Sequence, residues 1–269
     1  MKFAIVLVHG NPFSRCFDEV AETLMYGLRG LGHQAEITAS RLHRDAKNII
    51  LGAHLLSPYE SIPNGAILYN LEQPGSDLFS IYVARARAGC QMWDYSEGNI
   101  ARWQSLGIPA VHVPIGYVPE LSRVSPQDHD IDVLFYGSVN DRRAWVLNEV
   151  QAAGLRVQRL FGVFGAERDD AIARSKVVLN LHYYDSKIFE IARVSYLLAN
   201  RKAVVSEESV DMAADAEIGK GMLIVPYSGL VEACVRVVRD DTLRQQMERD
   251  GFELFSKIDE KEILQRVAA

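Results

Sequence analysis

Short apolar runs alternate with amphipathic stretches along the first part of the chain. Residues 3–8 are almost entirely apolar, which is typical of a strand that is buried on both faces of a parallel sheet. In residues 19–31 apolar side chains recur every three or four positions from Val20, which predicts a helix that packs one face on a sheet. Further strands are expected at 33–38, 48–55, 66–70, 90–94 and 110–113, and a helix at 97–106.

The alternation stops between Pro114 and Asp130, where proline, glycine and polar residues predominate as in a linker. It then restarts with strands expected at 132–136, 156–161, 176–181, 203–206 and 223–226, and helices at 143–153, 188–198, 230–238, 242–255 and 260–267. The pattern predicts an α/β protein with two Rossmann-like open-sheet domains facing a cleft. We expect residues 1–117 to form the first domain, 118–130 the linker, 131–255 the second domain, and 256–269 a C-terminal helix that packs back on the first.

Composition narrows the class of partner. The chain has 29 Lys and Arg against 35 Asp and Glu, a net charge of -6, which argues against a nucleic-acid backbone as the main partner. Its three cysteines are widely spaced, so they predict neither a disulfide framework nor a zinc site and favour a cytoplasmic location. No apolar run approaches the ~20 residues that cross a bilayer. Any membrane contact is therefore expected to be peripheral.

Two segments of the second domain have the chemistry of an anion site. The strand expected at 132–136 is followed by Gly137 and Ser138 and then by Arg142 and Arg143. Gly137 would let the backbone approach a ligand closely, and the backbone amides and guanidinium groups that follow would bind an anion. A surface turn with solvated arginines is the simpler alternative for this segment alone. The second segment has Lys187 and Glu190 after a strand that ends at Leu181. A lysine there would bind phosphate, and a carboxylate one turn on would accept hydrogen bonds from ribose hydroxyls. Together they predict a nucleoside diphosphate site.

These segments resemble the donor-binding domain of nucleotide-sugar glycosyltransferases with the GT-B fold. Residues 187–192, Lys-Ile-Phe-Glu-Ile-Ala, and 203–207, Ala-Val-Val-Ser-Glu, are similar to the family's "R/K-x-F-E-x-x-A … G-x-P-V-V" motif. The run from Val133 to Gly137 with its two arginines resembles the "F-x-G … R" element that opens that domain. The resemblance covers most of the chain and is closest to the CgeB-like, group 1 type of transferase. The acceptor half is its least specific part.

The resemblance implies roles for particular residues. Glu190 would bind the ribose, whereas Lys187, the amides after Gly137 and one of the two arginines would hold the diphosphate without a metal or a cofactor. Phe164 would lie near the base, although a core role is equally open. Many retaining members have a second glutamate at the position of His182. We therefore favour inversion, and His182 is expected either to contact the donor or to be a strand-end histidine bonded to backbone.

An inverting transfer needs a general base on the acceptor side. Three residues that follow strands of the first domain are candidates: Glu72, then His9, then Asp94, which could equally support the cap of the next helix. The remaining histidines, at 33, 43, 54, 112 and 129, show no ligand spacing and are expected at the surface or in loops.

The expected function is metal-independent transfer of a sugar from a nucleoside diphosphate-sugar donor to a glycan, lipid-linked or small-molecule hydroxyl acceptor. Two alternatives remain open. A nucleotide-sugar 2-epimerase of the same fold would need no acceptor. A non-catalytic nucleotide-sugar-binding subunit would bind the donor and turn over nothing.

Overall fold

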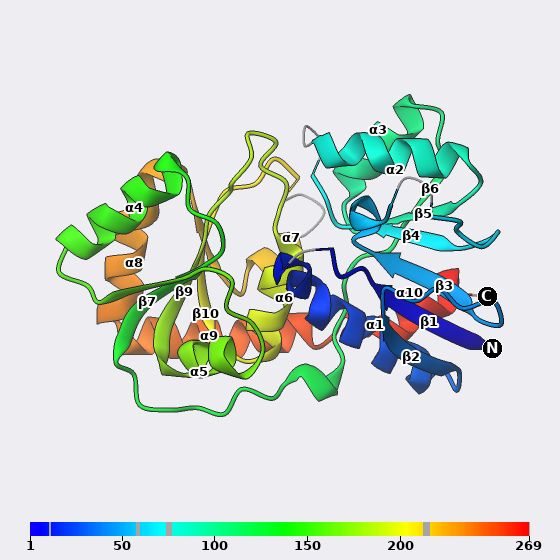
Figure 1. Cartoon of the computed structure of the whole chain (residues 1–269). Helices are drawn as coiled ribbons and strands as arrows, with labels where there is room; N and C mark the ends of the chain where they lie inside the picture. Colours follow the sequence, from blue (N-terminus) through cyan, green and yellow to red (C-terminus); the bar gives the residue numbers. More distant parts are fainter. Residues whose placement is uncertain (11, 58–59, 74–76, 212–215, 269) are drawn as a thin grey trace. The chain divides into compact units, whose positions relative to one another are not determined.

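The computed structural model describes residues 1–10, 12–57, 60–73, 77–211 and 216–268, with side chains except at 12–13 and 77–79. The chain forms two compact units (Figure 1). Unit 1 comprises Met1–Val118 and Ile258–Ala269, and unit 2 comprises Pro119–Lys257.

Unit 1 is built on a parallel six-stranded sheet in the order β2-β1-β3-β4-β5-β6. Its strands are β1 (Lys2–Leu7), β2 (Gln34–Ala39), β3 (Lys47–Leu51), β4 (Ile67–Asn70), β5 (Gln91–Asp94) and β6 (Ala110–His112). Its helices are η1 (Pro12–Phe17), α1 (Asp18–Gly30), η2 (Ala53–Leu55), α2 (Asp77–Arg87), α3 (Glu97–Ser105) and α10 (Glu260–Val267). Successive residues of β1 are buried on both faces of the sheet, which explains why this strand has no polar alternation.

Helices cover both faces of the unit 1 sheet (Figure 1). On one face, Tyr82 of α2 and Trp103 of α3 pack in a core with Ala4 and Val6 of β1. Helices α1 and α10 lie on the other face. They approach closely at Gly27, where an added Cβ would lie 2.7 Å from side-chain atoms of Glu260 and Leu264.

The last segment of the chain is bonded to the end of residues 1–118. Gly116 N donates to Glu260 Oε2 at 2.7 Å, and Tyr117 N donates to Ile258 O at 2.6 Å. Gly116 permits this approach, because a Cβ there would lie 2.8 Å from both Glu260 N and Ile258 O. Helix α10 therefore belongs to unit 1 although it follows unit 2 in sequence.

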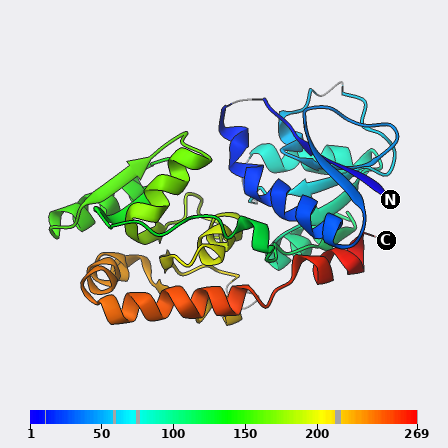
Figure 2. The same cartoon turned by 90° about the horizontal axis from the view of Figure 1, so that it is seen from below.

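Unit 2 has a parallel five-stranded sheet in the order β11-β10-β9-β7-β8. Its strands are β7 (Ile131–Tyr136), β8 (Val157–Leu160), β9 (Ser175–Asn180), β10 (Ala203–Glu207) and β11 (Leu223–Val225). Its helices are η3 (Pro119–Leu121), α4 (Asp141–Ala152), α5 (Ala166–Arg174), α6 (Ile191–Ala199), α7 (Ala216–Gly219), η4 (Tyr227–Gly229), α8 (Leu230–Arg239) and α9 (Asp241–Phe255). Apolar residues of α4 and α8 share one core with the sheet, and α9 is the long orange helix of Figure 2.

The segment expected as a linker is anchored to unit 2. Ser122 Oγ donates to Ala199 O at 2.8 Å, and the amides of Arg123 and Val124 each donate to Asn200 Oδ1 at 2.8 Å. These bonds tie the residues that precede β7 to the end of α6, so they pack as part of unit 2 rather than as a free connection.

The predicted α/β class with two parallel sheets is confirmed, and most predicted strands lie within one or two residues of the observed ones. Helices α2 and α5 were not predicted. The strand expected at 48–55 ends at Leu51, because Gly52 has a φ of 75° and a 3₁₀ turn follows.

The helix expected from residue 188 begins at Ile191, since Lys187 has a φ of 46° and Glu190 is the residue before the first helical turn. Glu190 is therefore at the N-cap position and not inside the helix.

Candidate functional site

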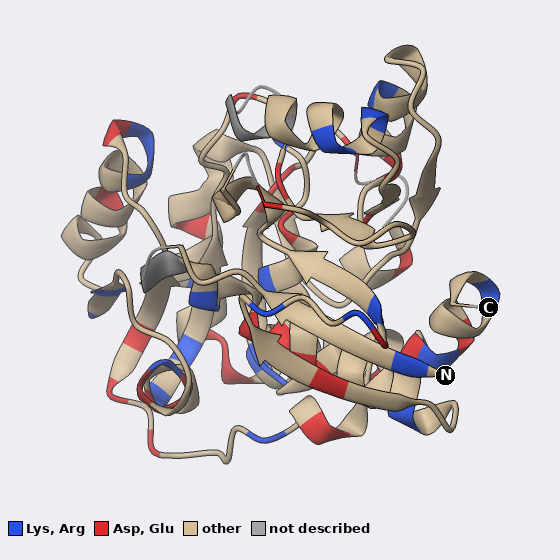
Figure 3. Ribbon diagram, turned by 45° about the vertical axis from the view of Figure 1, so that its right-hand side comes forward, with Lys and Arg blue, Asp and Glu red and all other residues tan. Residues whose placement is uncertain are grey.

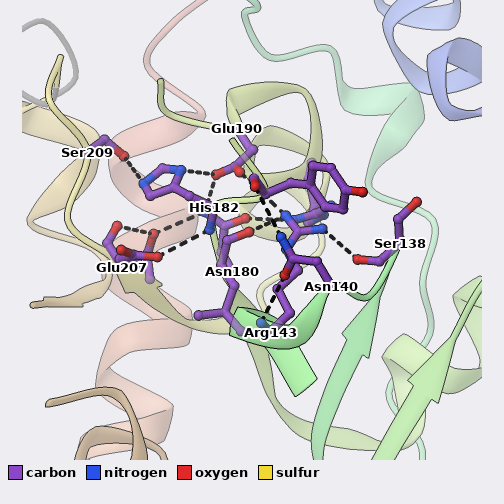
Figure 4. A network of polar contacts seen from close by, with 12 residues as sticks. Ser138, Asn140, Arg143, Asn180, His182, Glu190, Glu207 and Ser209 are labelled. Carbon is purple, nitrogen blue, oxygen red and sulfur yellow. Dashed lines mark hydrogen bonds and ion pairs between the residues drawn. The ribbon is translucent and has the colours of Figure 1, made fainter. Parts of the chain in front are cut away.

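Three loops of unit 2 meet where neighbouring parallel strands end. The turn 137–140 follows β7, the loop 181–190 follows β9, and residues 208–209 follow β10, in a sheet where these strands are adjacent. The carboxyl ends of parallel strands are where open α/β sheets bind ligands. Figure 4 shows the polar network at this edge. It brings together the glycine turn and the Lys187 to Glu190 segment that the sequence singled out.

Two arginines lie beside Gly137. An added Cβ on Gly137, whose φ is 133°, would lie 3.1 Å from Arg193 Nη2 and 3.7 Å from Arg143 Nη1. Arg143 is buried, and its guanidinium donates to the carbonyl oxygens of Ser138, at 2.8 Å, and Leu181. Burial, reinforced by the nearby charge of Arg193, lowers the pKa of Arg143 to about 10, so the side chain is still a cation at neutral pH. Two like charges side by side favour an anion between them.

Glu190 is the carboxylate of this cluster. Its Oε2 accepts a hydrogen bond from Asn180 Nδ2 at 3.0 Å, and its Oε1 lies 3.7 Å from Arg143 Nη2. Asn180 in turn accepts from Arg193 Nη1 at 2.8 Å. The Glu190 side chain is 15% exposed, so it is held by protein donors and still has surface through which a ligand hydroxyl could approach. The ribose role that the resemblance implies for Glu190 stays a prediction.

Arg142 is engaged elsewhere, which separates the two arginines that the sequence could not distinguish. Arg142 donates to both carboxylate oxygens of Glu207, one at 2.7 Å, and its guanidinium lies 4.1 Å from the centre of the Tyr227 ring. Burial raises the pKa of Glu207, but the hydrogen bonds and positive charge of Arg142 and the hydrogen bond from His182 N together outweigh burial, so the pKa is lowered. Arg142 thus serves as the partner of a buried carboxylate. Lys187 Nζ lies 3.6 Å from Glu207 Oε1 and its side chain is 41% exposed, so it has the freedom to reach a ligand.

The other predicted donor-side residues are Ser138, Phe164 and His182, and Asn140, which was not predicted, lies in the same turn as Ser138. Asn140 caps helix α4 by accepting a hydrogen bond from Arg143 N at 3.0 Å, and its Nδ2 donates to Tyr183 O at 3.2 Å. Ser138 is held in the same turn through its carbonyl oxygen. Phe164 is half-buried in the loop between β8 and α5. His182 is fully enclosed, with its ring between Glu190 and the residues that follow β10 (Figure 4).

In unit 1, Asp94 is a buried structural carboxylate. Its two oxygens accept from Trp103 Nε1 at 2.7 Å, Asn70 Nδ2 at 2.7 Å, Asn99 Nδ2 at 3.0 Å and Ser96 N at 2.9 Å. Its exposed fraction is 0%, and burial raises its pKa to about 6 in spite of these donors. The assignment of Asp94 as a candidate base is corrected, because an enclosed carboxylate cannot reach an acceptor. It supports the cap of α3.

Glu72 and His9 follow β4 and β1 and are not enclosed in this way. Glu72 Oε1 lies 3.7 Å from Nδ1 of His54, and the Glu72 side chain is 15% exposed. Burial raises the pKa of Glu72 and lowers that of His54, so it favours the neutral form of both. His54 was expected at the surface or in a loop, but its side chain is 7% exposed, because η2 turns it inward beside Glu72. His9 is exposed, with its backbone amide bonded to Ser40 Oγ at 2.8 Å.

Sequence reasoning missed Arg193, Asn180 and Glu207. A signal for Arg193 was present, since it lies three residues after Glu190 and this spacing places both at the start of one helix. The pairing of Glu207 with Arg142 had no such signal, because the two residues are 65 positions apart.

The charged side chains elsewhere are mixed in sign. In Figure 3 the blue Lys and Arg positions and the red Asp and Glu positions are interspersed along the ribbon. Among the described residues, no three His, Cys, Asp or Glu side chains gather so that they could hold a metal ion. In the same part of the chain, no helix has the length and apolar character to cross a membrane.

Comparison with known sequences finds distant relatives of unassigned function. No protein-family model matches the chain. Protein L137 of Acanthamoeba polyphaga mimivirus, an uncharacterized protein, is 28% identical over 164 residues, which cover 57% of this chain and 21% of L137. Protein L140 of the same virus, also uncharacterized, is 26% identical over 178 residues, which cover 63% of this chain and 58% of L140. The chain thus spans less than two thirds of the length of these relatives.

Comparison with solved structures is more informative about the fold. Anabaena HepE in complex with UDP-glucose superposes with a TM-score of 0.66 at 13% identity, over 100% of this chain and 98% of HepE. AviGT4, a glycosyltransferase involved in avilamycin A biosynthesis, gives a TM-score of 0.62 at 16% identity, over 100% and 96% of the two chains. Sucrose-phosphate synthase from Thermosynechococcus elongatus gives a TM-score of 0.61 at 14% identity, over 99% of this chain and 97% of the synthase. At sequence identities this low, structural similarity establishes the fold and not the function. The chain therefore has the two-domain α/β fold of the GT-B glycosyltransferases.

Proposed function

We propose that this protein is a glycosyltransferase that moves a sugar from a nucleoside diphosphate-sugar to a hydroxyl acceptor. The observation that carries the proposal is the placement of Arg143 and Arg193 beside Gly137, with the carboxylate of Glu190 in the same cluster. Paired guanidinium groups suit a diphosphate, and a carboxylate suits vicinal hydroxyls. HepE, which has the same fold, is a protein whose structure contains UDP-glucose.

The donor side works by charge stabilisation. Arg143 and Arg193, with Lys187 and the amides that follow Gly137, bind the diphosphate and stabilise the negative charge that develops on it as the glycosidic bond breaks. The cations of the protein take this role, so the proposed reaction needs no divalent metal. Glu190 accepts hydrogen bonds from the ribose and orients the nucleotide.

The acceptor side needs a group that removes the hydroxyl proton. We assign this role to Glu72, whose side chain retains exposed surface and whose pKa is raised by burial toward the range in which a base works best. His9 is the second candidate. Attack of the activated hydroxyl on the anomeric carbon, opposite the departing diphosphate, gives inversion. We propose a glycan, a lipid-linked molecule or a small molecule as the acceptor, and a cytoplasmic reaction with membrane contact, if any, at the surface.

A thermal-shift screen against UDP, GDP, dTDP, ADP and CMP, each with EDTA and with a divalent metal, tests the donor site. A ligand that binds only the native state raises its apparent stability. We expect one nucleoside diphosphate to raise the melting temperature equally with EDTA and with metal. Absence of a shift with every nucleotide, for protein shown to be folded, would contradict the proposal.

Product analysis then identifies the reaction. The corresponding nucleotide-sugar is incubated with a panel of hydroxyl acceptors, and the products are separated and weighed by mass spectrometry. Transfer of the sugar to an acceptor is expected. A nucleotide-sugar of unchanged mass but altered stereochemistry would instead indicate an epimerase, and binding without any product would indicate a non-catalytic subunit.

A further inference from the structure

His182 links Glu190 to the segment that follows β10. Its side chain is 1% exposed, and its Nδ1 lies 3.1 Å from Glu190 Oε2. On the other side of the ring, Nε2 lies 3.1 Å from the carbonyl oxygen of Glu208 and 3.0 Å from Ser209 Oγ (Figure 4). The ring is thus enclosed between a carboxylate and a carbonyl, both of which are acceptors.

The order Ser209, His182, Glu190 has the connectivity of a hydrolase triad, but the Nε2 contact argues against that chemistry. A triad histidine accepts the serine proton at an unprotonated Nε2. A backbone carbonyl has no hydrogen to donate, so the contact with Glu208 O is favourable only if Nε2 carries its own proton. With this proton in place, Nε2 cannot act as the base for Ser209.

The proton on Nε2 has a consequence for Nδ1. In a neutral ring protonated at Nε2, the electron-rich Nδ1 would lie 3.1 Å from the negatively charged Glu190 Oε2, which is repulsive. Nδ1 is buried and makes no hydrogen bond within the described residues. A proton on Nδ1 would turn the repulsion into attraction between opposite charges. We propose that His182 is a buried imidazolium that keeps Glu190 ionised and oriented. What Glu190 then binds rests on the function proposed above; His182 itself is a positioning residue.

The surrounding charges are compatible with this cation. His182 N donates to Glu207 Oε2 at 3.3 Å, so a second carboxylate lies on the β10 side. The cations nearby are partly compensated by the same acids, since Arg142 pairs with Glu207 and donates to His182 O at 3.2 Å. Arg143 and Lys187 lie 3.7 Å and 3.6 Å from Glu190 and Glu207. Two carboxylates therefore contact His182, Glu190 at the ring and Glu207 at the backbone amide.

Nitrogen NMR of the histidine rings tests the protonation state without any nucleotide. The chain has seven histidines, and the His182→Gln variant identifies the signals of His182 by their loss. We expect both ring nitrogens of His182 to be protonated at neutral pH. Glu190→Gln provides a second identification that does not need the histidine variant to fold, because loss of the carboxylate should convert the same ring to the neutral form. A His182 ring with only one protonated nitrogen at neutral pH would overturn the proposal.

A double-mutant cycle tests the positioning role. In the wild-type background we expect His182→Gln to weaken UDP binding by about tenfold, the scale of one lost charge-assisted contact. In the Glu190→Gln background the same change should have no effect, because there is no carboxylate left to position. His129→Gln, a change of the same type in a loop of unit 2, should leave the affinity unchanged in both backgrounds.

The pH dependence separates this proposal from the proposed function. A rise in pH that removes the second ring proton should weaken wild-type affinity, whereas the affinity of His182→Gln should not respond in this way, because that variant has no ring proton to lose. Equal losses for His182→Gln in both backgrounds, with the same pH profile as wild type, would contradict the positioning role while nucleotide binding stands. If no nucleotide binds the wild type, the proposed function fails, and the NMR result alone decides the charge of His182.

Discussion

Arg142 donates to both carboxylate oxygens of Glu207, and this pair determines which cations of the site remain for a ligand. Glu207 is buried, so loss of Arg142 would leave an uncompensated charge. Arg143 and Arg193, in contrast, lie beside Gly137, and the 3.7 Å separation of Arg143 from Glu190 is longer than a hydrogen bond. Arg142 is therefore paired with a buried carboxylate, and the proposed function gives anion binding to Arg143.

Replacement of Arg193 by alanine should weaken binding of the nucleoside diphosphate. Loss of one charge-assisted contact is worth about 1.5–3 kcal/mol, or roughly tenfold or more in affinity. Affinity for the nucleoside should change little, because it carries no phosphate. Calorimetric titration of UDP and uridine measures both. Arg239→Ala removes the same charge from the exposed end of α8 and should leave UDP affinity unchanged; equal losses in the two variants would point to a general charge effect.

Replacement of Glu190 by alanine should abolish discrimination between ribose and deoxyribose. A carboxylate that accepts from both ribose hydroxyls favours UDP over its 2′-deoxy analogue, since the analogue leaves part of the buried acceptor unpaired. We expect the wild type to prefer UDP by about tenfold and the variant to bind both ligands equally and weakly. Competition titrations with the two nucleotides give the ratio. A preference that survives in the variant would remove Glu190 from ribose recognition.

Replacement of Glu72 by glutamine tests the acceptor side. The amide retains the shape of the carboxyl group but cannot accept the hydroxyl proton, so turnover should fall by about 10²–10⁴-fold. Donor affinity should be unchanged, because the proposed donor-binding role is carried by Arg143, Arg193, Lys187 and Glu190 and not by Glu72. Initial rates with a saturating donor, measured beside the titrated affinity, separate the two. Unchanged turnover would transfer the role of base to His9.

The attachment of α10 should depend on pH through Glu260. This carboxyl group is buried, which raises its pKa to about 8, and its Oε2 accepts from Gly116 N. The group binds a proton more tightly in the folded than in the unfolded chain. Its contribution to stability is therefore complete below its ordinary pKa, about 4.3, and is lost as the pH rises through about 8.

The glutamine variant isolates this effect. Glu260→Gln cannot ionise, so its stability relative to wild type should increase with pH between these limits, by at most about 1.4 kcal/mol per pH unit. Urea denaturation of both proteins at about pH 5 and about pH 8 measures how the difference in their free energies of unfolding changes with pH. Ordinary carboxyl groups are ionised in the unfolded chain at both pH values, so the change reports on Glu260 in the folded protein. A difference that does not change with pH would show that Glu260 is ionised in the folded protein at both.

The sheets were predictable because their strands are short and apolar, as in β1, and because caps such as Ser96 mark where helices begin. Helix α5 was missed since charged residues dominate its sequence and only Ala171, Ile172 and Ala173 among its apolar residues are buried. Its position is set by the sheet it covers. At the site, Gly137 and Glu190 could be located from local pattern. The roles of Arg142 and Arg193 could not, because they depend on Glu207 and Asn180, which reach the cluster from other strands.

In the proposed function, the cluster beside Gly137 binds a nucleoside diphosphate through its phosphates without a metal. Calorimetric titration of the diphosphate, the monophosphate and the nucleoside of one base, all in EDTA, tests it most directly. We expect 1:1 binding, with affinity that decreases from the diphosphate to the monophosphate to the nucleoside, and a diphosphate affinity that falls with added salt. Equal affinity for all three, or diphosphate binding only after metal is restored, would contradict it.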